Sequence, residues 1–348
     1  MSQIFRQRVQ FVVALAVNSY VVLLVLYLAL RLLFGDGFWW LSLLNTFAHL
    51  LFLPLLVLLP LALLIRARGA ALRLLPLIVV AGLWFVPAYL PKTVLAANPT
   101  LKVLTFNVWR HNHDLHQIEG WVRQTQADIV MLQEISPTYA TDTLPGLLDI
   151  YPYQSSQADN TRWGGNIILS RYPILSQDYI DLQTPDNPSP LRLVLDVDGE
   201  AVAVYNVHLA WPSRQTPRLS LPWDNFGLRV LLGFDDRIRN QQIQHLVDHL
   251  KTEPHPFIIA GDFNASSSSA TYQPLATVMR DSFHEVGVGF GGTWPVSQVR
   301  GLLEIVPPLI RIDYIWHSDQ FRALDAQRGP ELGSDHLPLL VTLALPSS

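Results

Sequence analysis

Residues 257–264 of the chain, Phe-Ile-Ile-Ala-Gly-Asp-Phe-Asn, join an apolar run to a glycine, a carboxylate and an amide. Comparable polar endings occur elsewhere after residue 100, at Phe106-Asn107, Leu132-Gln133-Glu134, Val207-His208, Ile312-Asp313 and Ser334-Asp335-His336. Rigid scaffolds commonly present catalytic groups at strand ends. Six such endings in one segment therefore predict one active site assembled from distant parts of the chain.

The apolar runs after residue 100 are short and bounded by Gly, Pro, Asn and Asp, which is typical of strands. We expect strands at 102–106, 129–132, 166–170, 191–197, 201–207, 257–260, 312–316 and 339–343, and helices at 115–126 and 237–251. Strands mixed with helices over about 250 residues predict one α/β or α+β domain with a single core.

Seven motifs follow one another in this segment. They are Thr-Phe-Asn-Val at 105–108, Leu-Gln-Glu at 132–134, Gly-Asn-Ile-Ile-Leu-Ser-Arg-Tyr-Pro-Ile at 165–174, Asn-Val-His-Leu at 206–209, Gly-Asp-Phe-Asn at 261–264, Ile-Asp-Tyr-Ile at 312–315 and Ser-Asp-His-Leu-Pro at 334–338. On these motifs, residues 101–345 resemble the endonuclease/exonuclease/phosphatase superfamily of DNase I-like, metal-dependent phosphoesterases. The resemblance implies an α/β fold of two β-sheets packed face to face and flanked by helices, with the site at one end of the sandwich.

Phosphoester cleavage requires the residue types found in these motifs. A site must neutralise charge that develops on oxygen, hold a water in line and help the leaving group depart. Glu134, Asn107 and Asp335 offer hard oxygen ligands, which select Mg²⁺ or Mn²⁺ over Zn²⁺. The resemblance implies that Glu134 is the main metal ligand, that Asn107 supports it and that Asp335 lies beside them. The chain has no cysteine, which excludes a Cys nucleophile and a thiolate zinc site.

The resemblance also implies roles for five further residues. Asp262 orients or deprotonates the attacking water, and Asn264 and His208 bind phosphate oxygens. His336 is the central acid/base, and Asp313 holds its tautomer. A histidine paired with a buried carboxylate titrates near neutral pH, where a proton carrier is most useful.

The first 98 residues differ from the rest in charge and hydropathy. They hold seven basic residues and one acid, against 17 basic and 27 acidic residues in the remainder, so the net charge of −4 divides into +6 and −10. Three long apolar runs can each cross a hydrocarbon core of about 30 Å. A cleaved signal peptide is excluded because the first run is too long and two more follow. We predict a membrane anchor over residues 1–98 with transmembrane helices at about 9–34, 38–65 and 74–95, and a catalytic domain over 99–348.

Basic residues predict the orientation of this anchor, since Lys and Arg resist translocation. Arg6 and Arg8 precede the first predicted helix, and Arg66, Arg68 and Arg73 lie in or near the second loop. We therefore expect the amino terminus and this loop in the cytoplasm. Three spans then deliver the catalytic domain to the extracytoplasmic side of a bacterial inner membrane.

The superfamily resemblance leaves the substrate open, because its members cut nucleic acids, inositol phosphates, sphingolipids and other phosphoesters. A domain charge of −10 argues against a nucleic acid partner, since nucleases commonly bind a polyanion through a basic surface. The stretches 211–234 and 287–310 are rich in apolar and aromatic residues, and they either touch a bilayer or pack over the core.

The three helices and the Thr-Trp-Pro segment at 293–295 resemble the membrane-anchored bacterial branch that includes the teicoplanin-resistance-type proteins. This resemblance implies a Mg²⁺-dependent phosphoesterase that hydrolyses phosphate or diphosphate bonds of a lipid headgroup, such as polyprenyl diphosphate, a phospholipid or a sphingolipid. Two alternatives stay open, an extracytoplasmic nuclease and a non-enzymatic membrane scaffold. The complete motif set argues against the scaffold.

Overall fold

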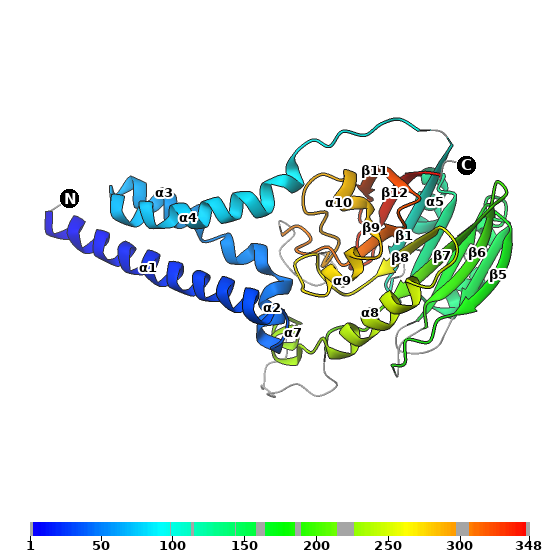
Figure 1. Ribbon diagram of the computed structural model, residues 1–348, viewed down its shortest axis with the longest axis horizontal. Helices are drawn as coiled ribbons and strands as arrows, with labels where there is room; N and C mark the ends of the chain where they lie inside the picture. The colour runs from blue at the N-terminus through cyan, green and yellow to red at the C-terminus, as the bar shows by residue number, and fades with distance from the viewer. Residues whose placement is uncertain are drawn as a thin grey trace. The chain divides into compact units, whose positions relative to one another are not determined.

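The computed structural model describes residues 3–97, 99–112, 115–142, 144–157, 164–184, 189–213, 226–296 and 306–345. The chain divides into two compact units, one comprising Met1–Leu90 and Ser268–Ala270 and the other Pro91–Ser267 and Thr271–Ser348. The amino-terminal unit is built from helices, whereas the other unit contains both β-sheets (Figure 1).

The helices of the amino-terminal unit are α1 (Gln3–Phe34), α2 (Trp39–Thr46), η1 (Ala48–Phe52), α3 (Leu55–Leu64), α4 (Arg68–Phe85) and η2 (Val86–Tyr89). Two of the segments, Gln3–Phe34 and Arg68–Tyr89, are long and apolar enough to cross a membrane. They correspond to the predicted helices at 9–34 and 74–95. The second of these begins earlier than predicted, at Arg68, and ends at Tyr89.

The predicted helix at 38–65 is not one continuous helix. It consists of α2, η1 and α3, and its two parts are bent by 77°. The bend lies at Phe47, between Trp39–Thr46 and Ala48–Leu64, where the backbone leaves the helical region with a φ of −110° and a ψ of 28°. The apolar composition of this stretch does not reveal the bend, because every residue type around it is compatible with a membrane span.

Three hydrogen bonds show that the bent segment runs antiparallel to α1. Gln10 Nε2 donates to Ile65 O at 2.8 Å, Tyr20 Oη donates to Leu51 O at 2.9 Å, and Tyr27 Oη donates to Asn45 Oδ1 at 3.0 Å. These contacts extend over about 25 Å of α1 at 1.5 Å per residue. The bent segment therefore runs back along α1, from the end near Asn45 to the end near Ile65.

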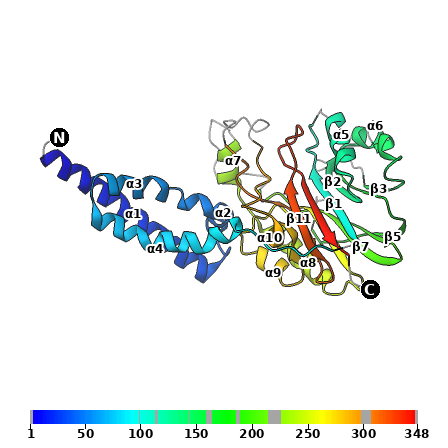
Figure 2. The same ribbon diagram turned by 90° about the horizontal axis from the view of Figure 1, so that it is seen from above.

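The second unit contains two six-stranded sheets (Figure 2). The first sheet has the order β11-β12-β1-β2-β4-β3, with β1 (Thr100–Asn107), β2 (Ile129–Ile135), β3 (Tyr153–Gln157), β4 (Gly165–Ser170), β11 (Arg322–Arg328) and β12 (Leu339–Ala344). The second has the order β5-β6-β7-β8-β10-β9, with β5 (Ile174–Tyr179), β6 (Leu191–Val197), β7 (Glu200–His208), β8 (Phe257–Asp262), β9 (Arg280–Asp281) and β10 (Asp313–His317).

Alternating side chains of the central strands build the layers of this unit. In β8, Ile258 and Ala260 enter the core between the two sheets, while Phe257 and Ile259 enter the core on the outer face. The outer faces are covered by α5 (Leu115–Thr125), α6 (Pro137–Asp142), η3 (Leu144–Leu147), α8 (Arg237–Leu250) and α9 (Tyr272–Ala276). The helix α10 (Ser282–Val286) packs Phe283 into the core between the sheets, and α7 (Phe226–Gly233) precedes α8. The predicted two-sheet α/β sandwich is confirmed.

Candidate active site

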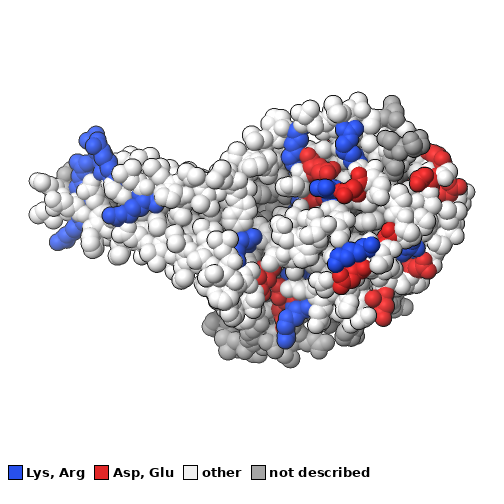
Figure 3. Space-filling view, in the orientation of Figure 1, with Lys and Arg blue, Asp and Glu red and all other residues white. Residues whose placement is uncertain are grey.

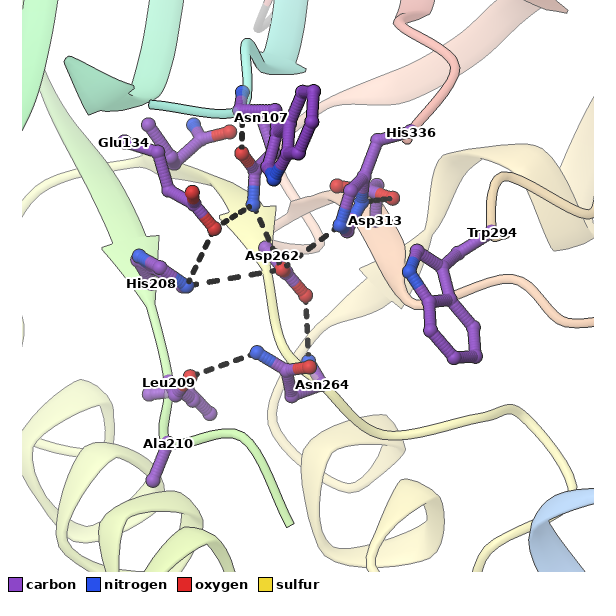
Figure 4. Close-up of polar contacts among 12 residues, drawn as sticks. Asn107, Glu134, His208, Leu209, Ala210, Asp262, Asn264, Trp294, Asp313 and His336 are labelled. Carbon is purple, nitrogen blue, oxygen red and sulfur yellow. Dashed lines mark hydrogen bonds and ion pairs between the residues drawn. The ribbon is translucent and has the colours of Figure 1, made fainter. Parts of the chain in front are cut away.

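Strand pairing brings the predicted site residues to one end of the sandwich. In the second sheet, His208 pairs with Asp262 across the parallel strands β7 and β8, and Asp262 pairs with Asp313 across the antiparallel strands β8 and β10. In the first sheet, Asn107 at the end of β1 lies opposite Gln133 of β2, next to Glu134. Figure 4 shows Asp262 near the centre of this group, facing side chains from several strands.

A break in strand pairing aims Glu134 toward this group. The β2–β4 register shifts between Leu132 and Ile135, and Glu134 has a φ of +59°, in the left-handed region that non-glycine residues rarely adopt. Gly164 packs against its backbone so closely that a Cβ on Gly164 would lie 2.7 Å from the Glu134 carbonyl carbon. The carboxylate is the more exposed member of its pair with His208, at 16% against 4%.

Asn107 connects the two carboxylates that lie on different sheets. Its Nδ2 donates to Glu134 Oε1 and to Asp262 Oδ2, both at 3.1 Å, and its Oδ1 accepts from Trp109 N at 3.0 Å. Because the amide oxygen faces Trp109, this arrangement supports Glu134 and Asp262 through N–H donors. A ligand role for the Asn107 oxygen stays a prediction.

Asp262, Asp313 and His336 form a compact buried cluster. His336 Nδ1 lies 2.9 Å from Asp313 Oδ2, and His336 Nε2 lies 3.7 Å from Asp262 Oδ2. One ligand atom from each of the three lies within 4.8 Å of the others. This cluster is not the predicted metal-binding trio of Glu134, Asn107 and Asp335, and the hydrogen bond to Asp313 already occupies one nitrogen of His336.

His208 and Asn264 complete the wall of the site. His208 Nε2 lies 3.8 Å from both Glu134 Oε1 and Asp262 Oδ2, which is longer than a hydrogen bond. Asn264 Nδ2 donates to Leu209 O at 2.9 Å, and its backbone N–H donates to Asp262 Oδ1 at 2.8 Å. The Oδ1 of Asn264 is buried and has no hydrogen-bond partner among the described residues, so it is available to a bound molecule.

The two histidines differ in charge because their surroundings differ. Burial lowers the pKa of His208, so this imidazole is neutral at pH 7. Burial also opposes a charged His336, but the attraction of Asp313 and Asp262 and the hydrogen bond to Asp313 outweigh it and raise the pKa of His336. Burial raises the pKa of Asp262 as well. The site therefore combines an imidazolium proton donor with a carboxylate suited to accept a proton.

Asp335 belongs to the last motif, residues 334–338, which precedes β12 and lies beside the cluster. Its Oδ2 accepts from Trp294 Nε1 at 3.3 Å, and its Oδ1 lies 4.0 Å from His336 Nε2. Ser334 Oγ donates to Asn107 O at 2.7 Å and ties the loop to the end of β1. All eight predicted site residues thus lie at this end of the sandwich, and their roles stay predictions.

The charges of the described residues fit a divalent cation. Glu134, Asp262, Asp313 and Asp335 bring four carboxylates to the site, and among the described residues His336 lies within 4.0 Å of three of them, Asp262, Asp313 and Asp335. Asp313 Oδ1 is buried without a hydrogen-bond partner in the described part of the chain. Buried charges are normally paired or bound to metal. A site with more carboxylates than cationic side chains, and with oxygen atoms as ligands, suits Mg²⁺.

A polar network beneath the site connects the two sheets, and no role was predicted for its members. Gln133 Nε2 donates to Asn206 Oδ1 at 2.7 Å, and Asn206 Nδ2 donates to Leu132 O at 2.8 Å and to Ile167 O at 2.7 Å. Both amides belong to motifs, and both are fully buried. They hold the sheets at a fixed distance where their strand ends form the site.

The stretches 211–234 and 287–310 meet beside the site. Residues 214–225 and 297–305 lie outside the described residues. The rings of Trp211 and Trp294 are 5.1 Å apart at an interplanar angle of 63°, and Trp294 also contacts Asp335. Trp294 therefore belongs to the site, and the Thr-Trp-Pro segment was the sequence feature that pointed to it.

Comparisons with known proteins agree with this geometry. The family described as "Endonuclease/Exonuclease/phosphatase family" matches residues 104–336. Similar solved structures are an endonuclease/exonuclease/phosphatase from Bacteroides vulgatus (18% identity, 71% of this chain and 100% of that chain, TM-score 0.55) and D. rerio TDP2 complexed with single strand DNA product (17%, 71% and 99%, 0.55).

A third similar structure is an endonuclease/exonuclease/phosphatase from Beutenbergia cavernae (19% identity, 71% of this chain and 72% of that chain, TM-score 0.50). At these identities the likeness to solved structures shows the fold alone. No curated protein matches the chain in sequence. The family match covers most of the chain, and this chain belongs to the Endonuclease/Exonuclease/phosphatase family.

Proposed function

We propose that the protein is a membrane-anchored, Mg²⁺-dependent phosphoesterase that hydrolyses phosphate or diphosphate bonds of a lipid headgroup on the extracytoplasmic side of a bacterial inner membrane. Members of its family are generally metal-dependent phosphoesterases or nucleases. The observation that carries the lipid proposal is the apolar helical unit, with two helices of spanning length and a third, broken pass, on the same chain as the phosphoester site.

The path of the helices supports the extracytoplasmic location. Two helices are long enough to span a membrane, and because the bent segment returns along α1 we count it as a third span. An odd number of spans would place the two ends of the anchor on opposite sides of a membrane. The basic residues at the amino terminus and near the start of α4 favour the cytoplasm for that end. Reporter fusions test this topology, and a cytoplasmic carboxyl terminus would contradict it.

The charge of the catalytic unit favours a lipid headgroup over nucleic acid. On the face in Figure 3, acidic and basic side chains of the described residues are interspersed over this unit, and they form no extended basic field. Residues 99–348 carry a net charge of −10. Non-specific binding to a nucleic acid depends on Lys and Arg that neutralise phosphates. A single headgroup needs only the few polar groups of the site.

The site residues can perform the proposed hydrolysis as follows. Glu134, supported by Asn107, would hold the metal together with Asp335, and a bound Mg²⁺ would neutralise charge on the phosphate oxygens. Asp262 accepts a proton from the attacking water, since burial raises its pKa. His336, held as imidazolium by Asp313, donates a proton to the leaving oxygen. His208 and Asn264 orient the phosphate from the opposite wall.

The test is a substrate screen with the full-length protein in detergent and Mg²⁺. The panel contains polyprenyl diphosphate, phospholipids, sphingomyelin and single- and double-stranded DNA. We expect release of phosphate or a phosphorylated headgroup from a lipid, and no release by His336→Ala. Hydrolysis of DNA alone would overturn the lipid proposal and favour the nuclease alternative, and no hydrolysis of any phosphoester would favour the scaffold alternative.

A further inference from the structure

We infer that Arg239, together with Gln242, is a positioning residue that fixes the two loops carrying His208 and Asn264. The inference rests on the proposed function, since it assigns these residues an effect on phosphoester hydrolysis without contact to the substrate. Both lie on α8, outside the set of residues that the motifs identify.

Arg239 is a fully buried cation on a helix whose other buried residues, apart from Gln242, are apolar. Ile243, Leu246 and Leu250 of α8 enter the core on the outer face of the second sheet, while Arg239 has no exposed surface. Burying an arginine is costly unless its charge and donors are satisfied. Its Nη2 donates to Asp236 Oδ2 at 3.0 Å, which provides the opposite charge.

The remaining terminal nitrogen of Arg239 acts on the site. Nη1 donates to the backbone carbonyl of Asn264 at 2.6 Å. Asn264 has a φ of +50°, a left-handed conformation that a non-glycine residue keeps only when its surroundings hold it. This conformation directs the Asn264 amide toward Leu209 and leaves its Oδ1 without a partner among the described residues.

Gln242, one helical turn further along α8, holds the other loop. Its Oε1 accepts from Ala210 N at 2.7 Å, two residues after His208, and its Nε2 donates to Thr184 Oγ1 at 2.8 Å. Asn264 Nδ2 also donates to Leu209 O (Figure 4). The loops after β7 and β8 are therefore bonded to each other as well as to α8. Loss of the Arg239 contact should therefore loosen both loops.

A double-mutant cycle separates positioning from a general contribution to stability. The four proteins are wild type, Arg239→Lys, Asn264→Ala and the double variant, assayed at full length in detergent with Mg²⁺ and bis(4-nitrophenyl) phosphate. We expect Arg239→Lys to lower kcat by about 10- to 100-fold with KM within about twofold, as is usual for residues that orient a site. In the Asn264→Ala background the same change should cost less activity than in wild type, because only the effect on the His208 loop remains.

The matched control is Arg192→Lys. Arg192 is also mostly buried and ion-paired, at 2.9 Å from Glu253, and it makes no contact with the site among the described residues. Its kcat should equal that of wild type. Equal kcat for Arg239→Lys and wild type, or a loss of equal size in both Asn264 backgrounds, would overturn the inference.

Hydrogen–deuterium exchange gives a readout that needs no turnover. Arg239→Lys should speed exchange in peptides covering 207–212 and 262–267, and Gln242→Leu should do so at 207–212 even if Arg239→Lys does not fold. Arg192→Lys should leave both peptides unchanged. Unchanged exchange in the Arg239 and Gln242 variants would refute positioning. If exchange changes as expected but no phosphoester is hydrolysed by wild type, the proposed function fails and the positioning stands.

Discussion

Asp313→Asn is the substitution that most sharply tests how His336 acts. Asp313 Oδ2 lies 2.9 Å from His336 Nδ1, and both side chains are buried. In the wild type, Asp313 and Asp262 raise the pKa of His336 and keep it positively charged. Asparagine has nearly the same shape but no charge, so it removes the attraction while preserving the packing.

The expected effect of Asp313→Asn on kcat and on the pKa of His336 can be estimated from the contact between the two side chains. A hydrogen bond to a charged group contributes about 1.5–3 kcal/mol, which corresponds to roughly 10- to 100-fold in kcat. A unit charge about 4 Å away contributes about 4 kcal/mol at an effective dielectric constant of about 20, or at most about three pKa units. The pKa of His336 should therefore fall, and the proton donor should be lost at lower pH than in wild type.

The assay is kcat for bis(4-nitrophenyl) phosphate against pH, with the full-length protein and saturating Mg²⁺. We expect the alkaline limb of the profile to move to lower pH by at least about one unit. Asp325→Asn, an exposed carboxylate on β11, serves as the control and should leave the profile unchanged. A variant with wild-type kcat and an unmoved alkaline limb would refute the proton-donor role of His336.

Three further predictions concern the metal, the break in β2–β4 pairing at Glu134 and the stability of the protein in acid. Removal of divalent ions with EDTA should abolish turnover and Mg²⁺ should restore it, whereas Glu134→Gln should stay inactive at every Mg²⁺ concentration; metal-independent turnover would disprove this. Gly164→Ala should lower the stability by about 1–3 kcal/mol in thermal melts and reduce kcat, because Gly164 has a φ of +65° and the new Cβ would collide with the backbone of Glu134. An unchanged melting temperature would argue against this packing. Burial would raise the pKa of Asp281, but the ion pair with Arg311 outweighs burial and holds this pKa below its ordinary value of about 3.9. The ion pair therefore stabilises the folded protein above that pH, and the stabilisation is lost as the pH falls further. Denaturant titrations should show this loss below about pH 4 in wild type and a smaller one in Asp281→Asn.

The central strands could be predicted from the sequence because both of their faces are buried. Each predicted strand is present, and each is an apolar run whose side chains pack into one or two of the hydrophobic cores of the domain. The four strands that were not predicted, β3, β5, β9 and β11, are the four edges of the two sheets. Edge strands carry polar residues that hinder aggregation, and β5 is exposed along most of its length. Their sequences therefore resemble loops.

The candidate site was predicted from its motifs, but its geometry required the structure. The bulge at Glu134 and the close approach of Gly164 arise from strand pairing that no local pattern encodes. Arg239 lies in a predicted helix, where an arginine resembles a solvated side chain until the packing of α8 shows it buried. The bend within 38–65 was missed because the hydropathy of a stretch does not depend on the direction of its helix axis.

The most direct test of the proposed function is the initial rate of headgroup release from lipid vesicles that contain the reconstituted full-length protein. Wild type and Glu134→Gln are compared with polyprenyl diphosphate, phospholipid and DNA substrates in Mg²⁺ buffer. We expect lipid hydrolysis by wild type that exceeds DNA hydrolysis and is lost in Glu134→Gln. Faster hydrolysis of DNA than of any lipid, or lipid hydrolysis that persists in Glu134→Gln, would contradict it.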